Sequence, residues 1–242
     1  MIPVTMDYFY APPEKRQGAT ILIDGEEFSH LSHVLRKAPG NRLTVVDGCG
    51  MAYAVTIREI VHHTAYCEIA GTHPRLHESE ADITLGVGIL KHSAQIDLLV
   101  EKTTELGVTR IVPLLTSRTI PRHAREERWR KVALAAMKQC GRCVLPAILP
   151  ITGFADFLQM FSPTTIKCIP HEKISRPVLA EVIAAGTSKE IALAIGPEGG
   201  FTEEEVAAAV LAGFQVVSLG PRRLRTETAA IGAVWAVTEW GK

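Results

Sequence analysis

Two polar, glycine-bearing loops, each placed directly after a short apolar run, constrain the fold of this chain more than any other feature. Ile191–Ile195 leads into I-G-P-E-G-G-F at 195–201, and Gln215–Leu219 leads into L-G-P-R-R-L-R-T-E-T at 219–228. A short continuous apolar run is typical of a parallel strand covered on both faces. Because ligands of open parallel sheets lie beyond the carboxyl ends of the strands, we expect these two loops to line one pocket.

The charge of the first loop limits what this pocket binds. Thr202 is a suitable helix N-cap with Glu205 at capping-box spacing, and Glu203 and Glu204 complete an acidic first turn. These carboxylates complement the helix dipole and, with Glu198, would repel a phosphate. We therefore expect a neutral or cationic ligand. A tight, well-capped turn without a ligand would also account for the glycines, since isolated glycine motifs are weak signals.

The same residues carry a resemblance to a known family. G-P-E-G-G-F-T-x-x-E at 196–205 and L-G-P-R-R-L-R-T-E-T-A at 219–229 resemble the two signature loops of the 16S ribosomal RNA uracil-N3 methyltransferases, a family in the SPOUT superfamily. Further matches extend the resemblance over nearly the whole chain: H-V-L-R at 33–36, K-T-T-E-L-G-V at 102–108 and Q-C-G-R at 139–142.

The resemblance implies an enzyme that uses S-adenosylmethionine to methylate the N3 nitrogen of a specific uridine in 16S ribosomal RNA, either as RNA or in the assembled small ribosomal subunit. The sulfonium cofactor is cationic, which suits the acidic loop. The expected cofactor contacts are Ile169, Pro170, His171, Ile195, Gly196, Pro197, Glu198, Gly199, Gly200, Leu219, Gly220, Leu224, Arg225, Thr226 and Thr228.

Methyl transfer to uracil N3 sets two requirements on the catalytic residues. The nitrogen is protonated at neutral pH and poorly nucleophilic, so the site must favour its anion and align it with the methyl group. Arg225 is the first candidate for a fixed cation near the uracil carbonyls. Glu198 and Glu227 are alternative candidates for the proton acceptor, and either could instead only hold a loop.

Basic residues are unevenly distributed along the chain. The net charge is zero, yet Arg110–Arg142 holds nine lysines and arginines against two glutamates. Such a local patch favours RNA contact, because the planar guanidinium suits phosphate, although a solvated helix face is the alternative. The predicted RNA contacts are Arg36, Lys91, Arg118, Arg122, Arg142, Arg222 and Arg223. Many family members have a small apolar residue in place of Arg223, and an arginine in the first strand, where this chain reads Met6-Asp7-Tyr8.

Composition excludes several other classes of protein. The 242 residues are 47% hydrophobic, with no run long enough to cross a bilayer and no secretory N-terminal pattern, so we expect a cytoplasmic protein. Five cysteines do not make a secreted disulfide pattern. Cys140-x-x-Cys143 lacks a second pair at zinc spacing, and His30 and His33 lack further ligands, so no metal site is predicted.

Residues 1–73 are predicted to form a β-rich domain, and 74–82 a polar linker. The predicted strands are Thr20–Ile23, Arg42–Asp47, Met51–Ile60 and Ala65–Ile69, interrupted by a helix at Glu26–Lys37. Several short strands this close suggest a small barrel or sandwich. The resemblance implies a PUA-like RNA-binding β-barrel for this domain.

Residues 83–242 alternate strands and helices, which indicates an α/β domain with a parallel sheet. The predicted elements include helices at Ser93–Leu106, Glu126–Cys140, Phe154–Phe161, Pro177–Ala185 and Glu227–Trp240, and strands at Arg110–Leu115 and Thr165–Ile169. The resemblance implies a SPOUT-type domain with a deep trefoil knot, against the general rule on topology. It also implies a homodimer near the apolar last helix.

Other functions remain open from the sequence. The chain could methylate a different RNA nucleotide, or act as a non-catalytic dimeric RNA-binding protein. A nucleotide-dependent enzyme is disfavoured, because no G-K-[ST] motif is present. Gly86 and Gly88 form only a partial dinucleotide fingerprint, since Lys91 occupies the place of the third glycine.

Overall fold

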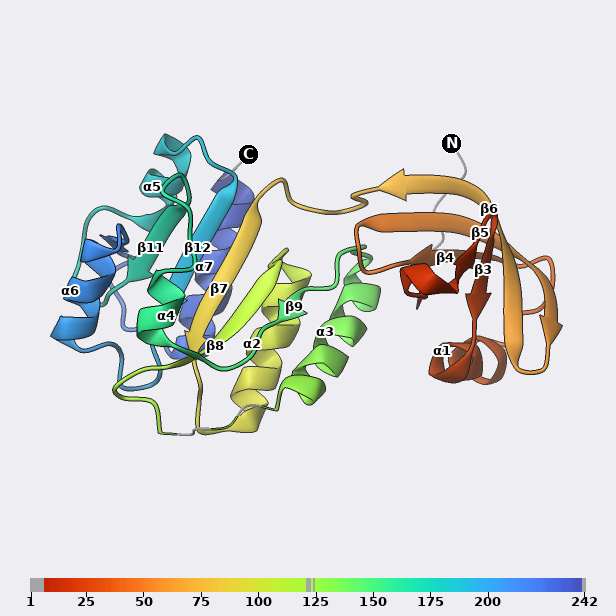
Figure 1. Cartoon of the computed structure of the whole chain (residues 1–242), viewed down its shortest axis with the longest axis horizontal. Coiled ribbons are helices and arrows are strands. Elements are labelled where there is room, and N and C mark those ends of the chain that lie inside the picture. The colour runs from red at the N-terminus through yellow and green to blue at the C-terminus, as the bar shows by residue number, and fades with distance from the viewer. Residues whose placement is uncertain (1–6, 121–122, 124, 241–242) are drawn as a thin grey trace. The chain divides into compact units, whose positions relative to one another are not determined.

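The chain folds into two compact units in a computed structural model (Figure 1). The described residues are 7–120, 123 and 125–240, with the side chain of Trp240 excepted. The first unit holds the chain up to Glu78 together with Leu134–Leu145, and the second holds Ser79–Ala133 and the chain from Pro146 onward. Contiguous domains were predicted, so the membership of 134–145 in the first unit was not anticipated.

The first unit is built on a six-stranded sheet with the order β1-β4-β5-β6-β3-β2. Its strands are β1 (Tyr8–Tyr10), β2 (Arg16–Gln17), β3 (Thr20–Ile23), β4 (Arg42–Val46), β5 (Met51–Val61) and β6 (Thr64–Pro74). β1 pairs with β4 in parallel and the other pairs are antiparallel. Alternate side chains of β3 are buried, with Ile21 and Ile23 in the core, as its alternating sequence requires.

The helix of this unit is shorter than predicted and changes its pitch. After the 3₁₀ turn η1 (Pro13–Lys15), α1 (Gly25–Ser29) continues into a π-helical turn, η2 (His30–Val34). Phe28 and Leu31 bury the inner face in the core. Arg36 adopts a left-handed backbone conformation with a φ of 51°, which ends the helix before the predicted boundary at Lys37.

The second unit confirms the predicted α/β class. Its strands are all parallel, in the order β10-β8-β7-β12-β11-β13, with β9 also paired to β8. The strands are β7 (Asp82–Gly88), β8 (Arg110–Leu115), β9 (Ala147–Ile148), β10 (Thr152–Gly153), β11 (Ile166–Pro170), β12 (Glu190–Ile195) and β13 (Gln215–Val217). The helices are α2 (Ser93–Glu105), α3 (Glu126–Cys140), α4 (Phe154–Leu158), α5 (Leu179–Ala185), α6 (Glu203–Leu211) and α7 (Thr226–Trp240).

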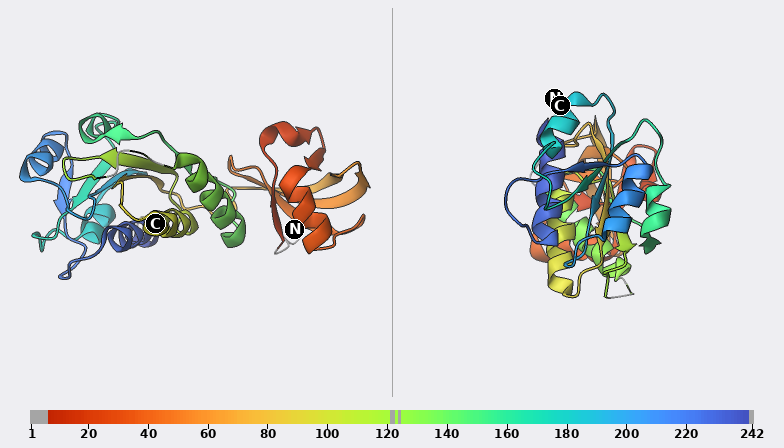
Figure 2. Two further views of the ribbon diagram at one scale, coloured as in Figure 1. Left: turned by 90° about the horizontal axis from the view of Figure 1, so that it is seen from below. Right: turned by 90° about the vertical axis from the view of Figure 1, so that its left-hand side faces the viewer.

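Helices cover both faces of this sheet (Figure 2). α7 packs against α2 and α5, and α4 packs against α6. The glycines of β7 are explained by this packing: a Cβ on Gly86 would lie 2.4 Å from the Phe157 ring, and one on Gly88 would lie 2.4 Å from the Pro197 nitrogen. They make room for neighbouring groups and do not form a nucleotide fingerprint. No helix of the described residues is long and apolar enough to span a membrane.

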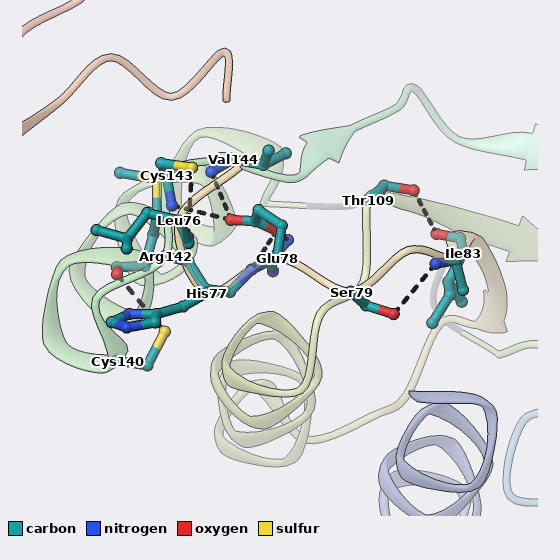
Figure 3. Close-up of polar contacts among 12 residues, drawn as sticks. Leu76, His77, Glu78, Ser79, Ile83, Thr109, Cys140, Arg142, Cys143 and Val144 are labelled. Carbon is teal, nitrogen blue, oxygen red and sulfur yellow. Dashed lines mark hydrogen bonds and ion pairs between the residues drawn. The ribbon is translucent and has the colours of Figure 1, made fainter. Parts of the chain in front are cut away.

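The segment 134–145 is held in the first unit by a buried ion pair (Figure 3). Arg142 donates from Nε (3.0 Å) and Nη2 (2.7 Å) to Oε2 of Glu78, and both side chains are 2% exposed. Oε1 of Glu78 accepts from the backbone nitrogens of Cys143 and Val144, each at 2.9 Å. The prediction that Arg142 contacts RNA is therefore wrong, because its guanidinium is buried and bonded to a carboxylate.

The Cys140-x-x-Cys143 motif also belongs to this packing. Neither cysteine forms a disulfide, and Cys143 packs with Val46, Ala52 and Met137 in a second small core of the unit. Burial raises the pKa of the Cys143 thiol to about 11, so it is a poor nucleophile at neutral pH. This agrees with the interpretation of the pair as ordinary thiols.

We predict that Glu78→Ala destabilises the first unit by about 3–5 kcal/mol, since it leaves the Arg142 charge buried without a partner. Glu68→Ala is the matched control, because Glu68 and Arg58 form an exposed pair in the same unit. That variant should cost about 0–1 kcal/mol. Hydrogen exchange of the β4 and β5 amides in increasing urea measures both values. Equal losses in the two variants would contradict the structural role of Glu78.

Candidate functional site

A pocket of about 660 Å³ lies in the second unit, lined by the segments that follow β7, β8, β11, β12 and β13. β7 and β12 are neighbours, but the chain leaves β7 for β8 on one side and reaches β12 from β11 on the other. Ligands of parallel α/β sheets bind at such a reversal of strand order. The two glycine loops thus meet in one pocket, as predicted.

Most of the predicted cofactor residues line this pocket. Two do not: Ile169 is fully buried in the core of the unit, and Thr228 is exposed on α7 outside the pocket lining. Further lining residues, which were not named as cofactor, catalytic or RNA contacts, come from the segment after β7, from the loops after β11 and β12, and from the first turns of α6 and α7. They are His92, Gln95, Glu172, Lys173, Phe201, Glu203 and Ala229.

The loop after β12 folds back on itself. The Gly200 nitrogen donates to the Pro197 carbonyl at 2.8 Å, and Gly200 has a φ of 69°, a conformation that favours glycine. A Cβ on Gly196 would lie 3.1 Å from the Cα of Gly200, which leaves little room for a side chain. The Thr226 hydroxyl donates to the Gly196 carbonyl at 3.0 Å and so connects this loop to the start of α7.

Arg118 holds the same loop from the segment after β8. Its Nη1 donates to the carbonyls of Gly199 (2.7 Å) and Phe201 (3.2 Å). A Cβ on Gly199 would lie 3.2 Å from the Cβ of Arg118, so the glycine admits the arginine side chain. Next to it, the Ser117 nitrogen donates to Glu205 at 2.7 Å. Arg118, predicted as an RNA contact, thus uses its guanidinium to fix the loop.

The predicted acidic first turn of α6 is present, but it supplies only some of the charged groups of the pocket. The predicted capping box is confirmed: Glu205 N donates to the Thr202 hydroxyl at 3.2 Å, and Thr202 N donates to Glu205 at 2.9 Å. Six lysines and arginines line the pocket together with four glutamates. The pocket therefore combines acidic groups with basic groups from other loops, which the charge of the first loop did not indicate.

The two candidate proton acceptors differ in their surroundings. Glu198 is exposed, and its Oε1 accepts from the backbone nitrogen of Lys91 at 2.9 Å, so it holds the segment after β7. Glu227 is 9% exposed, and its Oε1 accepts from Nε2 of Gln95 at 3.2 Å. Gln95 was not predicted as a site residue, although its place in the first turn of the helix that follows β7 could have indicated that it lines the pocket.

The predicted basic residues differ in whether they line the pocket and whether their side chains are paired. Arg225 lines the pocket, is exposed, and has no side-chain hydrogen bond within the described part of the chain. Arg222 and Lys91 are also exposed lining residues, whereas Arg223 pairs with Glu172 at 3.0 Å. The remaining two predictions concern Arg36, an exposed residue of the first unit, and Arg122, which lies outside the described residues.

Part of the arginine-rich segment is engaged within the protein. Arg128 makes three hydrogen bonds to the carboxylate of Asp97, and Arg130 donates to the carbonyl of Ile148. These contacts reduce the number of guanidinium groups that are free for phosphate. Over the described residues, no group of three or more His, Cys, Asp or Glu side chains has the arrangement of a metal site.

Comparison with known proteins identifies the family. Residues 77–238 match the family model described as RNA methyltransferase domain, and residues 23–70 match the model described as RNA methyltransferase PUA domain. The chain is 32% identical over 221 residues to ribosomal RNA small subunit methyltransferase E of Synechocystis sp., a match that covers 90% of this chain and 72% of that protein.

Two solved structures are similar over nearly the whole chain. The ribosomal RNA small subunit methyltransferase E of Neisseria gonorrhoeae bound to S-adenosyl methionine has a TM-score of 0.85 and 35% identity, with 95% of each chain covered. A putative methyltransferase of Legionella pneumophila in complex with the cofactor SAM has a TM-score of 0.81 and 30% identity, with 98% of each covered. The chain therefore belongs to the RNA methyltransferase family that includes these ribosomal RNA small subunit methyltransferases E.

Proposed function

We propose that this protein uses S-adenosylmethionine to methylate the N3 nitrogen of a uridine in the RNA of the small ribosomal subunit. The observation that carries the proposal is the single pocket formed by the two glycine loops, in a chain similar over nearly its whole length to small-subunit RNA methyltransferases. Incubation of small-subunit particles with labelled cofactor, followed by mass spectrometry of the nucleosides, tests it. Absence of N3-methyluridine would contradict the proposed position.

The residues present fit the cofactor. A volume of about 660 Å³ is in the range of small-molecule sites, and Ile195, Leu219 and Leu224 give it an apolar lining. Glu198 and Glu203 supply negative charge for a cation. Gly199 and Gly200 bring backbone without side chains to the pocket lining. When bound, the cofactor supplies an electrophilic methyl group.

Arg225 is the proposed cation for the uracil anion. Its guanidinium lines the pocket without an internal hydrogen-bond partner in the described chain, so it is free to donate to a uracil carbonyl. A fixed donor of this kind stabilises developing charge without reorganisation. Alignment of the two reactants in one pocket contributes roughly 7 kcal/mol or more when the geometry is good.

Glu227, and not Glu198, is the proposed acceptor of the N3 proton. The Glu198 carboxylate already holds Lys91 and is exposed, which favours a role in fixing the loop. The Glu227 carboxylate is largely buried, lines the pocket and accepts from Gln95. A carboxylate that accepts one side-chain hydrogen bond keeps lone pairs free to take a proton.

The remaining parts of the proposal concern RNA and architecture. RNA phosphates are proposed to contact Lys91, Arg222 and Arg223 at the pocket and Arg36 in the PUA-like unit. The proposed place of this reaction is the cytoplasm.

We also propose a closed β-barrel in the first unit and a deep trefoil knot in the second. The insertion of β12 between β7 and β11, with three successive loops lining one pocket, supports the knot.

We predict that Gly199→Val weakens S-adenosylmethionine binding about tenfold or more, equivalent to about 1.4 kcal/mol, because the new side chain displaces Arg118 from the loop. The thermal midpoint should change little. Arg118→Ala should reproduce the loss, and the double variant should not be additive. Isothermal titration measures the affinities. A collapsed thermal midpoint with normal affinity would show that the glycine only supports the fold.

We predict that Arg225→Ala lowers the single-turnover rate constant of methyl transfer about a hundredfold or more, the scale for losing one well-placed donor. Cofactor affinity should stay within a few fold. Arg223→Ala is the matched control from the same loop, since its guanidinium is paired with Glu172, and it should stay near the wild-type rate at saturating RNA. A near-normal rate for Arg225→Ala would remove this residue from the mechanism.

The dimer is also a proposal, and α7 is its expected interface. Trp235 on α7 is 52% exposed, and Leu98 on the neighbouring α2 is 43% exposed, which is costly to leave in water. Trp235→Glu should therefore shift a dimer to a monomer in sedimentation velocity at micromolar concentration. Leu211→Glu on α6, where Leu211 is 90% exposed, should leave the dimer intact. A monomeric wild type would contradict the proposal.

A further inference from the structure

The proposed mechanism gives no role to the amide of Gln95, which lies in the pocket lining. This residue lies in the first turn of α2, directly after the carboxyl end of β7. It lines the pocket, and its Nε2 donates to Oε1 of Glu227 at 3.2 Å. α2 and α7 pack against each other, so the contact joins the first turns of two neighbouring helices.

The amide of Gln95 turns its nitrogen toward Glu227. Oε1 of Gln95 is buried and has no hydrogen-bond partner among the residues that the structure describes. An unpaired buried acceptor is unfavourable, yet turning the amide round would place this oxygen against the Glu227 carboxylate. An ionised carboxylate only accepts hydrogen bonds, whereas a protonated one could donate to the amide oxygen. The amide therefore presents to Glu227 the group from which a carboxylate can accept a hydrogen bond.

Within the described chain, Gln95 is the one side chain bonded to the Glu227 carboxylate. The first turn of α7 also favours a negative charge at this position. The other charged or titratable side chains that line the pocket are Lys91, His92, Arg118, His171, Glu172, Lys173, Glu198, Glu203, Arg222, Arg223 and Arg225.

We propose that Gln95 is a positioning residue that keeps Glu227 ionised and directed at the pocket. The inference rests on the proposed function, in which the proton passes from uracil N3 to an oxygen of Glu227 and the nitrogen then takes the methyl group. Gln95 itself exchanges no proton. Its contribution is a hydrogen bond that favours the charged form of the acceptor.

Gln95→Met removes the donor and keeps the length of the side chain. Without this hydrogen bond, the charged form of the Glu227 carboxylate loses a stabilising contact. The rate needs ionised Glu227, so the acid limb of the pH–rate profile should move to higher pH, with recovery at still higher pH. Gln95→Lys supplies a charged donor, and its acid limb should lie at or below that of the wild type.

Two measurements test the role of Gln95. Single-turnover methyl transfer on small-subunit particles gives the pH–rate profile, and the carboxyl ¹³C shift of Glu227 in the protein alone gives its titration midpoint. Gln159→Met, at the exposed end of α4, makes the same chemical change outside the pocket and should move neither.

An unchanged Glu227 midpoint in Gln95→Met overturns the proposal, even where activity falls uniformly. If Gln95→Met does not fold, Gln95→Lys carries the test, and a midpoint above that of the wild type overturns it. A shifted midpoint in a protein that never methylates the particles would support the role of Gln95 while contradicting the proposed function. The NMR titration therefore tests the role of Gln95 independently of the proposed function.

Discussion

The close approach of the loop after β12 to strand β7 is the constraint on which the site depends. β7 and β12 pair in parallel, and at their carboxyl end the Pro197 nitrogen comes so near Gly88 that a Cβ there would lie only 2.4 Å away. Glycine at 88 therefore lets this loop cross the end of its neighbour. The same crossing places Glu198 where its carboxylate accepts from the Lys91 backbone, just before the helix that carries Gln95.

The two signs of charge in the pocket suit two different ligands. Two of the four glutamates, Glu198 and Glu203, come from the loop after β12 and the first turn of α6, where they complement a helix N-terminus and a cationic cofactor. Basic groups come from the segments after β7, β8, β11 and β13, where RNA phosphates could be met. A pocket of a single sign would favour one of these ligands and repel the other.

The sequence correctly predicted the elements that depend on local periodicity and helix capping. The apolar run before each glycine loop, the capping box at Thr202 and the helix Glu126–Cys140 are all as predicted, because local periodicity and capping determine them. It failed where the partner is distant in sequence. Nothing near Arg142 indicates that Glu78, 64 residues earlier, binds its guanidinium, and nothing near Gln95 indicates a contact with Glu227, 132 residues later.

Two of the buried carboxylates, Glu78 and Glu227, differ in how many hydrogen bonds they accept, and the difference supports the different roles proposed for them. Glu78 accepts four hydrogen bonds, two from the Arg142 guanidinium and two from backbone nitrogens, so its charge is fully compensated. Glu227 accepts one described side-chain bond, from an amide whose own oxygen is left unpaired. A carboxylate that serves only the fold gains nothing from such incomplete bonding, whereas one that must take up and release a proton needs a free position.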